Sequence, residues 1–505
     1  MADFPSFSFS RRSVVAGAWS CSLAFFALCS GCAVGPDFVR PAPPSVERYT
    51  TATQLVSMVE ADGTSQSFES GAAVNGAWWK LFRSADLDAA MQQALDHNAS
   101  LQSAQAALRQ SQQNLKAGYG VFYPSVGVDL SAVRERVSPF ERGVGTAAGV
   151  FNLYTLGAAV SYALDVFGGA RRTVEGLAAQ TDFQRHTLSA TYLTVSGNVV
   201  NTLIAQAAYL EQIDATEELI ALQSEQLDIA RARADAGTVP YSTVLSVQSQ
   251  LASSRASIPA LRQRVDQADH LLASLAGRTP AEWRSPKLAF ASLSLPRTLP
   301  LSLPSALVRQ RPDILSAEAQ LHMASANIGV TTAALFPTMT LNGAYGRSGA
   351  TFGSLEENAG KFWSVGPGMS FPLFEGGTLR YRNKAAIEAY RKSLADYRQV
   401  VLSAFAQVAD TLTALEHDAQ AVQAQGEAVA SAEQALQLLQ ANYRAGLVGY
   451  VDVLIADAQF YQARIAYLQA KTQRYQDTTA LFLALGGGWQ DGPLTHALSD
   501  REAYP

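Results

Sequence analysis

A long segment of this chain occurs twice, and the two copies agree in order and in spacing. Residues near 94–277 return near 307–486, about 210 residues later. Val121-Phe122-Tyr123-Pro124 matches Ala334-Leu335-Phe336-Pro337, and Ala236–Tyr241 matches Ala445–Tyr450. Solenoid repeats have periods of about 20–50 residues, so a unit of this length that is present twice indicates a duplicated half-protein.

The composition excludes several functional classes. With 505 residues, 48% of them hydrophobic and 16% charged, the chain can build a sizeable core. A formal net charge of -5 argues against a nucleic-acid partner. Cys21, Cys29 and Cys32 all lie at the N-terminal end, and the six histidines lack ligand spacing. We therefore expect no metal site and no disulfide in the body of the protein.

The first 31 residues have the pattern of an export signal. Arg11-Arg12 supply the positive region, and Val14–Leu28 form an apolar stretch that is too short for a permanent membrane span. Cys32 follows Ser30-Gly31 and resembles the modified cysteine of a bacterial lipoprotein signal, although Cys29 stands where that signal usually has leucine. We expect residues 1–31 to be removed and Cys32 to carry a covalent lipid. The twin arginine leaves the Tat route open, but the Sec route is favoured.

Each copy contains two segments in which apolar and small polar residues alternate, as in β-strands. Near 121–166 the apolar positions are Val126, Val128, Leu130, then Leu156, Val160, Leu164. Near 335–374 they are Met339, Leu341, Tyr345, then Trp363, Val365, Met369. Segments of roughly ten residues with one apolar face are typical of transmembrane β-barrels. Amphipathic hairpins of a soluble sheet are the alternative, and the export signal favours the membrane interpretation.

Four strands cannot close a membrane barrel, because the smallest such barrels have about eight. The sheet edges must therefore be closed by other chains, which predicts a cyclic homo-oligomer. Two copies would give about eight strands and three copies about twelve, and the pattern of the strands does not choose between them.

Long helices follow each hairpin after a glycine-rich corner that contains Gly169 in the first copy and Gly377 in the second. Runs near 171–236 and 378–445 contain no proline, and each would be about 100 Å long. They end at Gly237 and Gly446, where we expect turns into returning helices near 241–276 and 450–485. Helical periodicity also predicts one entering helix per copy, near 84–118 and 306–333.

The copies are joined by a segment with five prolines, which we expect to be too broken for regular structure and to lie at the waist of the helical part. These features divide the chain into a lipid-anchored N-terminal segment, two repeats, an equatorial linker and a tail. The expected bounds are 32–83, 84–279 (repeat 1), 280–305 (linker), 306–488 (repeat 2) and 489–505.

Several motifs resemble those of one family. The anchor segment reads Gly31-Cys32-Ala33-Val34-Gly35-Pro36-Asp37-Phe38, and Trp78-Trp79 follows. The second copy contains Arg311-Pro312-Asp313-Ile314 and Tyr443-Arg444-Ala445-Gly446. Together they resemble the TolC-like outer-membrane efflux proteins, in particular the lipoprotein branch that serves resistance-nodulation-division (RND) pumps.

The resemblance implies a mainly α-helical fold with a transmembrane β part. Three chains would contribute four strands each to one 12-stranded outer-membrane β-barrel, which continues into a long periplasmic α-helical barrel. It further implies that the chain is a passive exit duct for small toxic compounds and not an enzyme. Its partners would be a periplasmic membrane-fusion adaptor, an inner-membrane RND pump and outer-membrane lipid. The lipid would be carried by Cys32, and the chain would lie in the bacterial outer membrane and extend into the periplasm.

The resemblance also indicates a gate at the tip turns, near 446–450. By match to the family, Asp452 faces the lumen and forms a ring of three carboxylates that attracts cations. Val451 occupies the position of an apolar ring, while Ser242 and Tyr443 are retained or similar. Thr243, Val448 and Ile455 replace charged residues of the best-known gate. An alternative is that Asp452 only compensates the dipole of a helix N-terminus.

No arrangement of nucleophile, base and acid suggests catalysis. The Arg311-Pro312-Asp313 motif is explained by the geometry of a helix start. Two other functions remain open at this level. One is an outer-membrane duct of a type I protein-secretion system, and the other is a periplasmic coiled-coil scaffold or adaptor, which would not explain the four amphipathic strands.

Overall fold

The computed structural model describes residues 33–50, 57–137, 149–286 and 288–489. The expected signal peptide, Cys32 and the tail after Trp489 lie outside the described residues. The chain forms two compact units. The first comprises Met1–Arg40, Gln110–Asp182 and Glu318–Asp396, and the second comprises Pro41–Arg109, Phe183–Ala317 and Tyr397–Pro505. Each unit contains parts of both sequence copies.

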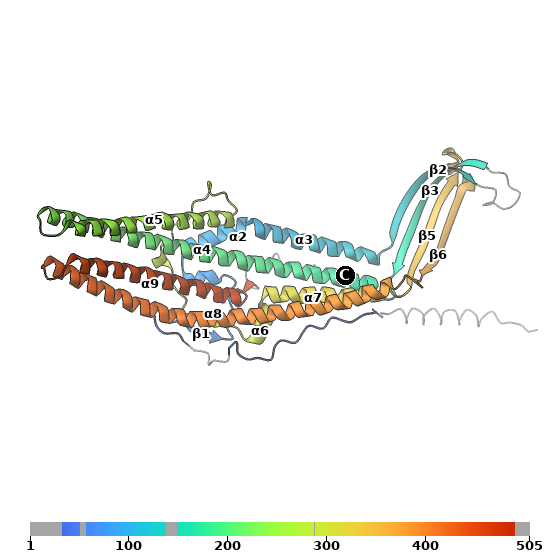
Figure 1. The fold of residues 1–505 in the computed structure, drawn as a ribbon. Coiled ribbons are helices and arrows are strands. Elements are labelled where there is room, and N and C mark those ends of the chain that lie inside the picture. Colours follow the sequence, from blue (N-terminus) through green and yellow to red (C-terminus); the bar gives the residue numbers. More distant parts are fainter. Residues whose placement is uncertain (1–32, 51–56, 138–148, 287, 490–505) are drawn as a thin grey trace, which may run out of the picture. The chain divides into compact units, whose positions relative to one another are not determined.

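The first unit contains a four-stranded antiparallel sheet (Figure 1). Its strands are β2 (Ser125–Val137), β3 (Gly149–Leu164), β5 (Thr338–Gly349) and β6 (Lys361–Ser370), in the order β2-β3-β5-β6. The central pair, β3 with β5, joins the hairpin of one copy to the hairpin of the other. This confirms the four predicted strands and leaves β2 and β6 at the two edges.

The register places apolar residues on one face of this sheet. Leu130 pairs with Leu156, Ala158 with Tyr345, and Tyr345 with Trp363. The opposite face is small and polar, and there the Ser161 hydroxyl donates to Asn342 Oδ1 at 2.9 Å. The side chains of the apolar face are largely exposed in the single chain, for example Val128 (73%) and Trp363 (74%).

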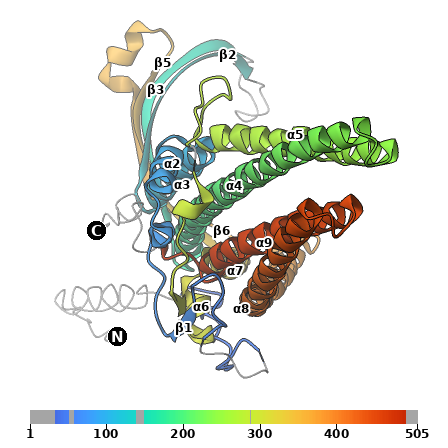
Figure 2. The ribbon, with the colours of Figure 1, turned by 90° about the vertical axis from the view of Figure 1, so that its left-hand side faces the viewer.

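The long helices have the predicted extents. Helices α4 (Gly169–Asp235) and α8 (Thr378–Arg444) contain 67 residues each. They are followed by α5 (Tyr241–Leu275) and α9 (Tyr450–Ala484), which contain 35 residues each. In the second unit α5 runs beside α4, and α9 runs beside α8 (Figures 1 and 2). The two copies thus give two helical hairpins.

The prediction of one continuous entering helix per copy is wrong. In the first copy α2 (Ala85–His97) ends and α3 (Ala99–Tyr119) begins at Asn98. In the second copy α6 (Pro304–Gln310) ends and α7 (Pro312–Ala333) begins at Arg311, the equivalent position.

Both breaks lie where a returning helix ends. The Asn98 side-chain amide donates to the carbonyl of Leu275 at 2.9 Å, and Arg311 Nη1 donates to the carbonyl of Ala484 at 2.9 Å. The last carbonyls of a helix lack partners within the helix, so these side chains satisfy them. Asn98 also caps α3, because its Oδ1 accepts from the Leu101 amide at 3.1 Å.

The linker between the copies contains more regular structure than its prolines predict. Strand β4 (Thr298–Leu301) pairs in parallel with β1 (Ser67–Ser70). Leu299 and Leu301 are buried, and this burial explains why the segment is ordered despite Pro300. The remaining elements are the short 3-10 helices Trp78–Phe82, Gly120–Phe122, Phe290–Ser292, Gly353–Glu356 and Asn358–Gly360.

The core of the second unit is centred on aromatic residues. Trp78 and Phe82 are fully buried, and the Trp78 ring stacks on Phe482 with centroids 5.4 Å apart. Phe82 packs against Tyr475, whose hydroxyl donates to the Leu293 carbonyl of the linker at 3.0 Å. These contacts join the N-terminal segment, the linker and α9 in one hydrophobic core.

Candidate functional site

The two tip turns that follow α4 and α8 have the same backbone structure. Gly237 and Gly446 have positive φ values of 67° and 77°. Their amides donate to Ala234 and Tyr443, and the next amides donate to Arg233 and Asn442. This is the Schellman arrangement, in which a left-handed glycine satisfies the last carbonyls of a helix. Both turns therefore end their helices at equivalent residues.

The corners after the strands also depend on glycine. Gly376 and Gly377 have positive φ values, and in the first copy the left-handed residue is Gly168. Gly169 begins α4, and a Cβ atom added there would lie 3.1 Å from the Cβ of Ala333. The two predicted corner glycines thus have different local roles.

The predicted gate residues lie at the start of α9. Val451 is 59% exposed, and Asp452 is exposed in the first helical turn. Asp452 Oδ2 accepts from the Gly449 amide at 3.1 Å. The carboxylate therefore compensates the helix N-terminus, while the exposed side chains remain free to face an axis in an oligomer.

The other predicted tip residues make different contacts. The Tyr443 ring lies 4.3 Å from the Arg233 guanidinium carbon and packs edge-on against Tyr450 at 5.4 Å. In α5, the Ser242 carbonyl accepts from Ser246 Oγ at 3.0 Å, and the Thr243 amide donates to Pro240. Among the described residues no hydrogen bond joins Ser242 or Thr243 to Val451 or Asp452.

The structure adds a polar seam between α4 and α9 that the sequence did not predict. The Tyr450 hydroxyl donates to Gln226 Oε1 at 2.6 Å, and the hydroxyls of Thr216 and Tyr461 lie 2.8 Å apart. Between these contacts, Gln223 Nε2 donates to Asp457 Oδ2 at 3.3 Å. The seam links a helix of the first hairpin to a helix of the second.

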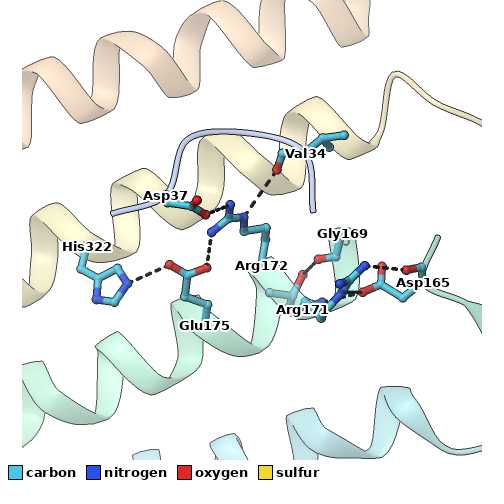
Figure 3. A network of polar contacts seen from close by, with 9 residues as sticks. Val34, Asp37, Asp165, Gly169, Arg171, Arg172, Glu175 and His322 are labelled. Carbon is cyan, nitrogen blue, oxygen red and sulfur yellow. Dashed lines mark hydrogen bonds and ion pairs between the residues drawn. The ribbon is translucent and has the colours of Figure 1, made fainter. Parts of the chain in front are cut away.

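A second polar cluster fixes the N-terminal segment in the first unit (Figure 3). Arg172 of α4 is bonded through Nη2 to Asp37 at 2.6 Å and through Nη1 to Glu175 at 2.7 Å. The other Glu175 oxygen lies 2.8 Å from His322 Nε2, and the His322 ring stacks on Phe38. Buried Arg172 is therefore the centre of a network that holds the segment just after Cys32.

Close backbone contacts in this segment require small residues. Gly35 has a φ of 94°, and a Cβ added to it would lie 2.5 Å from Gly329 Cα. The Val34 amide donates to the Phe167 carbonyl at 3.1 Å. The residues after the predicted lipidation site are thus packed directly against the corner that leads from β3 into α4.

The residues from 90 to 278 and from 303 to 487 match the model of one protein family, described as outer membrane efflux protein. The chain belongs to the outer membrane efflux protein family. The two matched segments correspond to the two sequence copies, so the match to the family covers both of them. The chain is therefore a channel of the bacterial outer membrane and not an enzyme.

Two relatives and one solved structure show how far the similarity extends. The pyoverdine export outer membrane protein OpmQ of Pseudomonas putida is 30% identical over 424 residues, which cover 82% of this chain and 89% of the relative. Outer membrane protein OprJ of Pseudomonas aeruginosa is 27% identical over 470 residues, which cover 91% of this chain and 94% of OprJ. The structure of the outer-membrane channel OprN superimposes with a TM-score of 0.82 at 27% identity, covering 91% of this chain and all of that one.

Within the described residues, no group of three or more histidine, cysteine, aspartate or glutamate side chains is placed to hold a metal ion. None of the described helices combines the length and hydropathy that a membrane span needs.

Proposed function

We propose that three copies of this chain form the exit duct of a tripartite RND efflux system, which conducts small toxic compounds passively to the outside of the cell. The observation that carries the proposal is the four-stranded sheet with two free edges and an exposed apolar face. Unpaired edges are not stable in lipid, so β2 of one copy must pair with β6 of the next. Three copies would supply a closed barrel of about twelve strands.

The polar face of the sheet would line the lumen, and the apolar face would contact lipid. Ser161, Asn342 and Thr340 are joined by hydrogen bonds on the polar face, which is the pattern expected beside water. A wide, polar lumen of this kind would offer little that discriminates between substrates. Substrate selection would therefore be made by the pump.

The partners of the duct are part of the same proposal. A periplasmic membrane-fusion adaptor would bind the helical tips, and an inner-membrane RND pump would supply the substrate. The lipid on Cys32 would hold the N-terminus in the membrane, next to the docked segment that begins at Ala33. Pyoverdine export belongs to OpmQ, and the compounds carried by this chain can differ from it.

The test is deletion of the gene, followed by a susceptibility profile against antibiotics, dyes and detergents. An efflux duct predicts greater susceptibility that is restored by the wild-type gene. Unchanged susceptibility together with loss of a secreted protein would contradict the proposal and identify a type I secretion duct. In a parallel experiment the purified protein should be a detergent-soluble trimer, whereas a monomer that is soluble after removal of the lipid would exclude a duct.

A further inference from the structure

Asp457 is a buried acid in a place where the chain offers it no positive partner. It lies two turns into α9 and is 1% exposed. Within the described part of the chain its side chain is hydrogen-bonded to Gln223 of α4, which is also fully buried. Among the described residues no lysine or arginine forms an ion pair with it. An ionised carboxylate in such a site would be strongly destabilising.

Two oxygen atoms of this pair are unsatisfied. Gln223 Nε2 donates to Asp457 Oδ2, but Asp457 Oδ1 and Gln223 Oε1 are both buried without a hydrogen-bond partner. A carboxylic acid and a primary amide can exchange two hydrogen bonds side by side. If Asp457 carries its proton on Oδ1, that proton can be donated to Gln223 Oε1, and both orphaned oxygens are satisfied.

We infer that Asp457 and Gln223 form a proton-dependent latch that holds the α8–α9 hairpin against the α4–α5 hairpin near the tip turns. Loss of the proton leaves two acceptors, Oδ1 and Oε1, facing one another and a buried negative charge. Both costs are relieved when the seam separates and water reaches the carboxylate. Closing of the seam therefore binds a proton, and opening releases it. The inference rests on the proposed duct, because it assigns the seam a role in opening the tip.

The neighbouring groups do not oppose this assignment. Burial raises the pKa of Asp457, and the hydrogen bond from Gln223 only partly offsets the rise. On α9 the nearby titratable group is Tyr450, whose pKa is raised by burial and by Asp457, so its phenol stays neutral. From α8, Tyr443 contacts Tyr450, and the Arg233 guanidinium of α4 lies over the Tyr443 ring. Leu436 of α8 packs with Val453 and Ala456 of α9 in an apolar cluster between these two helices.

The position of the pair gives the latch its effect. Apolar contacts also cross the seam, because Tyr450 of α9 packs in the cluster formed by Leu227, Ala230, Val244, Val247 and Leu251 of the first hairpin. The polar contacts of Tyr450, Asp457 and Tyr461 with Gln226, Gln223 and Thr216 add to them. Of these three contacts, only the one with Asp457 includes a carboxyl group. An ion pair of Glu218 on α4 with Arg464 on α9 also joins the two helices, but the Glu218 side chain is 63% exposed. The buried carboxyl group of the seam is that of Asp457, and the latch acts through it.

The experiment measures the open probability of the full-length trimer in planar bilayers from about pH 5 to about pH 9. For the wild type, opening should increase with pH, by at most about tenfold per pH unit for each Asp457 that releases its proton, until Asp457 is ionised in the closed state as well. Asp457→Asn keeps a side-chain amide that can exchange two hydrogen bonds with Gln223 and cannot titrate, so it should stay closed with a flat profile. Gln223→Leu removes the partner and should open more at every pH.

The matched control is Asp228→Asn, which removes an acid with a 74% exposed side chain from α4 and should keep the wild-type profile. A second measurement does not depend on current through the channel. Infrared spectra near neutral pH should contain the C=O absorption of protonated carboxyl groups, and Asp457→Asn should remove part of it, because Asp418 also has a raised pKa.

Equal pH profiles of the wild type and Asp457→Asn would overturn the latch, and so would a carboxyl absorption that is the same in both proteins. If the trimer conducts no current and does not restore efflux, the proposed duct fails, and the infrared band still decides whether Asp457 is protonated.

Discussion

At Asp452 one carboxylate combines two roles that a substitution can separate. Its Oδ2 accepts the Gly449 amide at the start of α9, and its side chain is exposed at the tip. A helix N-terminus is stabilised by either a carboxylate or an amide oxygen, but only the carboxylate attracts cations. The residue pattern alone indicated both roles equally, since it contains no information about the axis of an oligomer.

We predict that Asp452→Asn lowers the cation selectivity of the trimer several-fold and changes the free energy of unfolding by less than about 1 kcal/mol. The reversal potential across a salt gradient measures the selectivity. Asp228→Asn, which removes one exposed charge elsewhere on the hairpins, is the control. Unchanged selectivity would assign Asp452 to the helix start alone and would place the constriction elsewhere.

Asp418 of α8 gives a second prediction at this scale. Burial and the neighbouring Asp477 raise its pKa from 3.8 to about 7, while Arg474 opposes the rise. The folded chain therefore retains a proton that the unfolded chain releases, and stability falls as the pH rises from about 4 to about 7. Above about pH 7 this contribution to the free energy of unfolding is fully lost and no longer changes with pH.

Asp418→Asn should remove this pH dependence and stabilise the protein at about pH 8 by about 1–2 kcal/mol, after allowance for solvent screening. Thermal unfolding followed by the helical circular dichroism signal, at a series of pH values, measures the effect. Asp410→Asn, at an exposed position of the same helix, is the control. A variant that keeps the wild-type slope would show that another group binds the proton.

At the scale of elements, periodicity predicted the long helices and the strands because each pattern is local. The breaks at Asn98 and Arg311 could not be read in the same way. Their hydrogen-bond partners, Leu275 and Ala484, lie 177 and 173 residues away, and the helical spacing of apolar residues continues through both breaks. Local patterns likewise could not predict strand β4, which forms by pairing with β1. Nor could they predict the contact of Asp457, because its partner lies 234 residues away on another helix.

We predict that Asn98→Ala costs about 1–3 kcal/mol of stability, because it removes the cap of α3 and leaves the buried Leu275 carbonyl without its donor. Chemical unfolding of the trimer in detergent, followed by circular dichroism, measures the loss. Gln93→Ala, an exposed substitution one turn earlier on α2, should change stability by less than about 0.5 kcal/mol. If Asn98→Ala lowered the free energy of unfolding as little as Gln93→Ala does, the hydrogen bond of Asn98 to Leu275 would not stabilise the fold.

At the scale of the whole molecule, the sheet is complete only in an oligomer. A single chain leaves β2 and β6 unpaired and exposes apolar side chains that would otherwise contact lipid. The alternation along the strands was sufficient to predict these faces. It could not give the number of copies, since closure depends on strand tilt and stagger as well as on strand number.

Two adjacent residues of β2 test the assignment of the faces. Leu130 lies on the apolar face opposite Leu156, and Ser131 lies on the polar face opposite Thr155. Leu130→Arg would place a charge in lipid, which costs about 2–4 kcal/mol near the middle of the bilayer, so the yield of heat-resistant trimer should fall. Ser131→Arg would place the same charge in water, so the trimer should form normally and conduct cations less well. Gel mobility before and after heating measures the trimer, and bilayer recordings measure the conductance. If Ser131→Arg abolished the trimer while Leu130→Arg did not, the two faces would be reversed and the duct proposed here would lose its lumen.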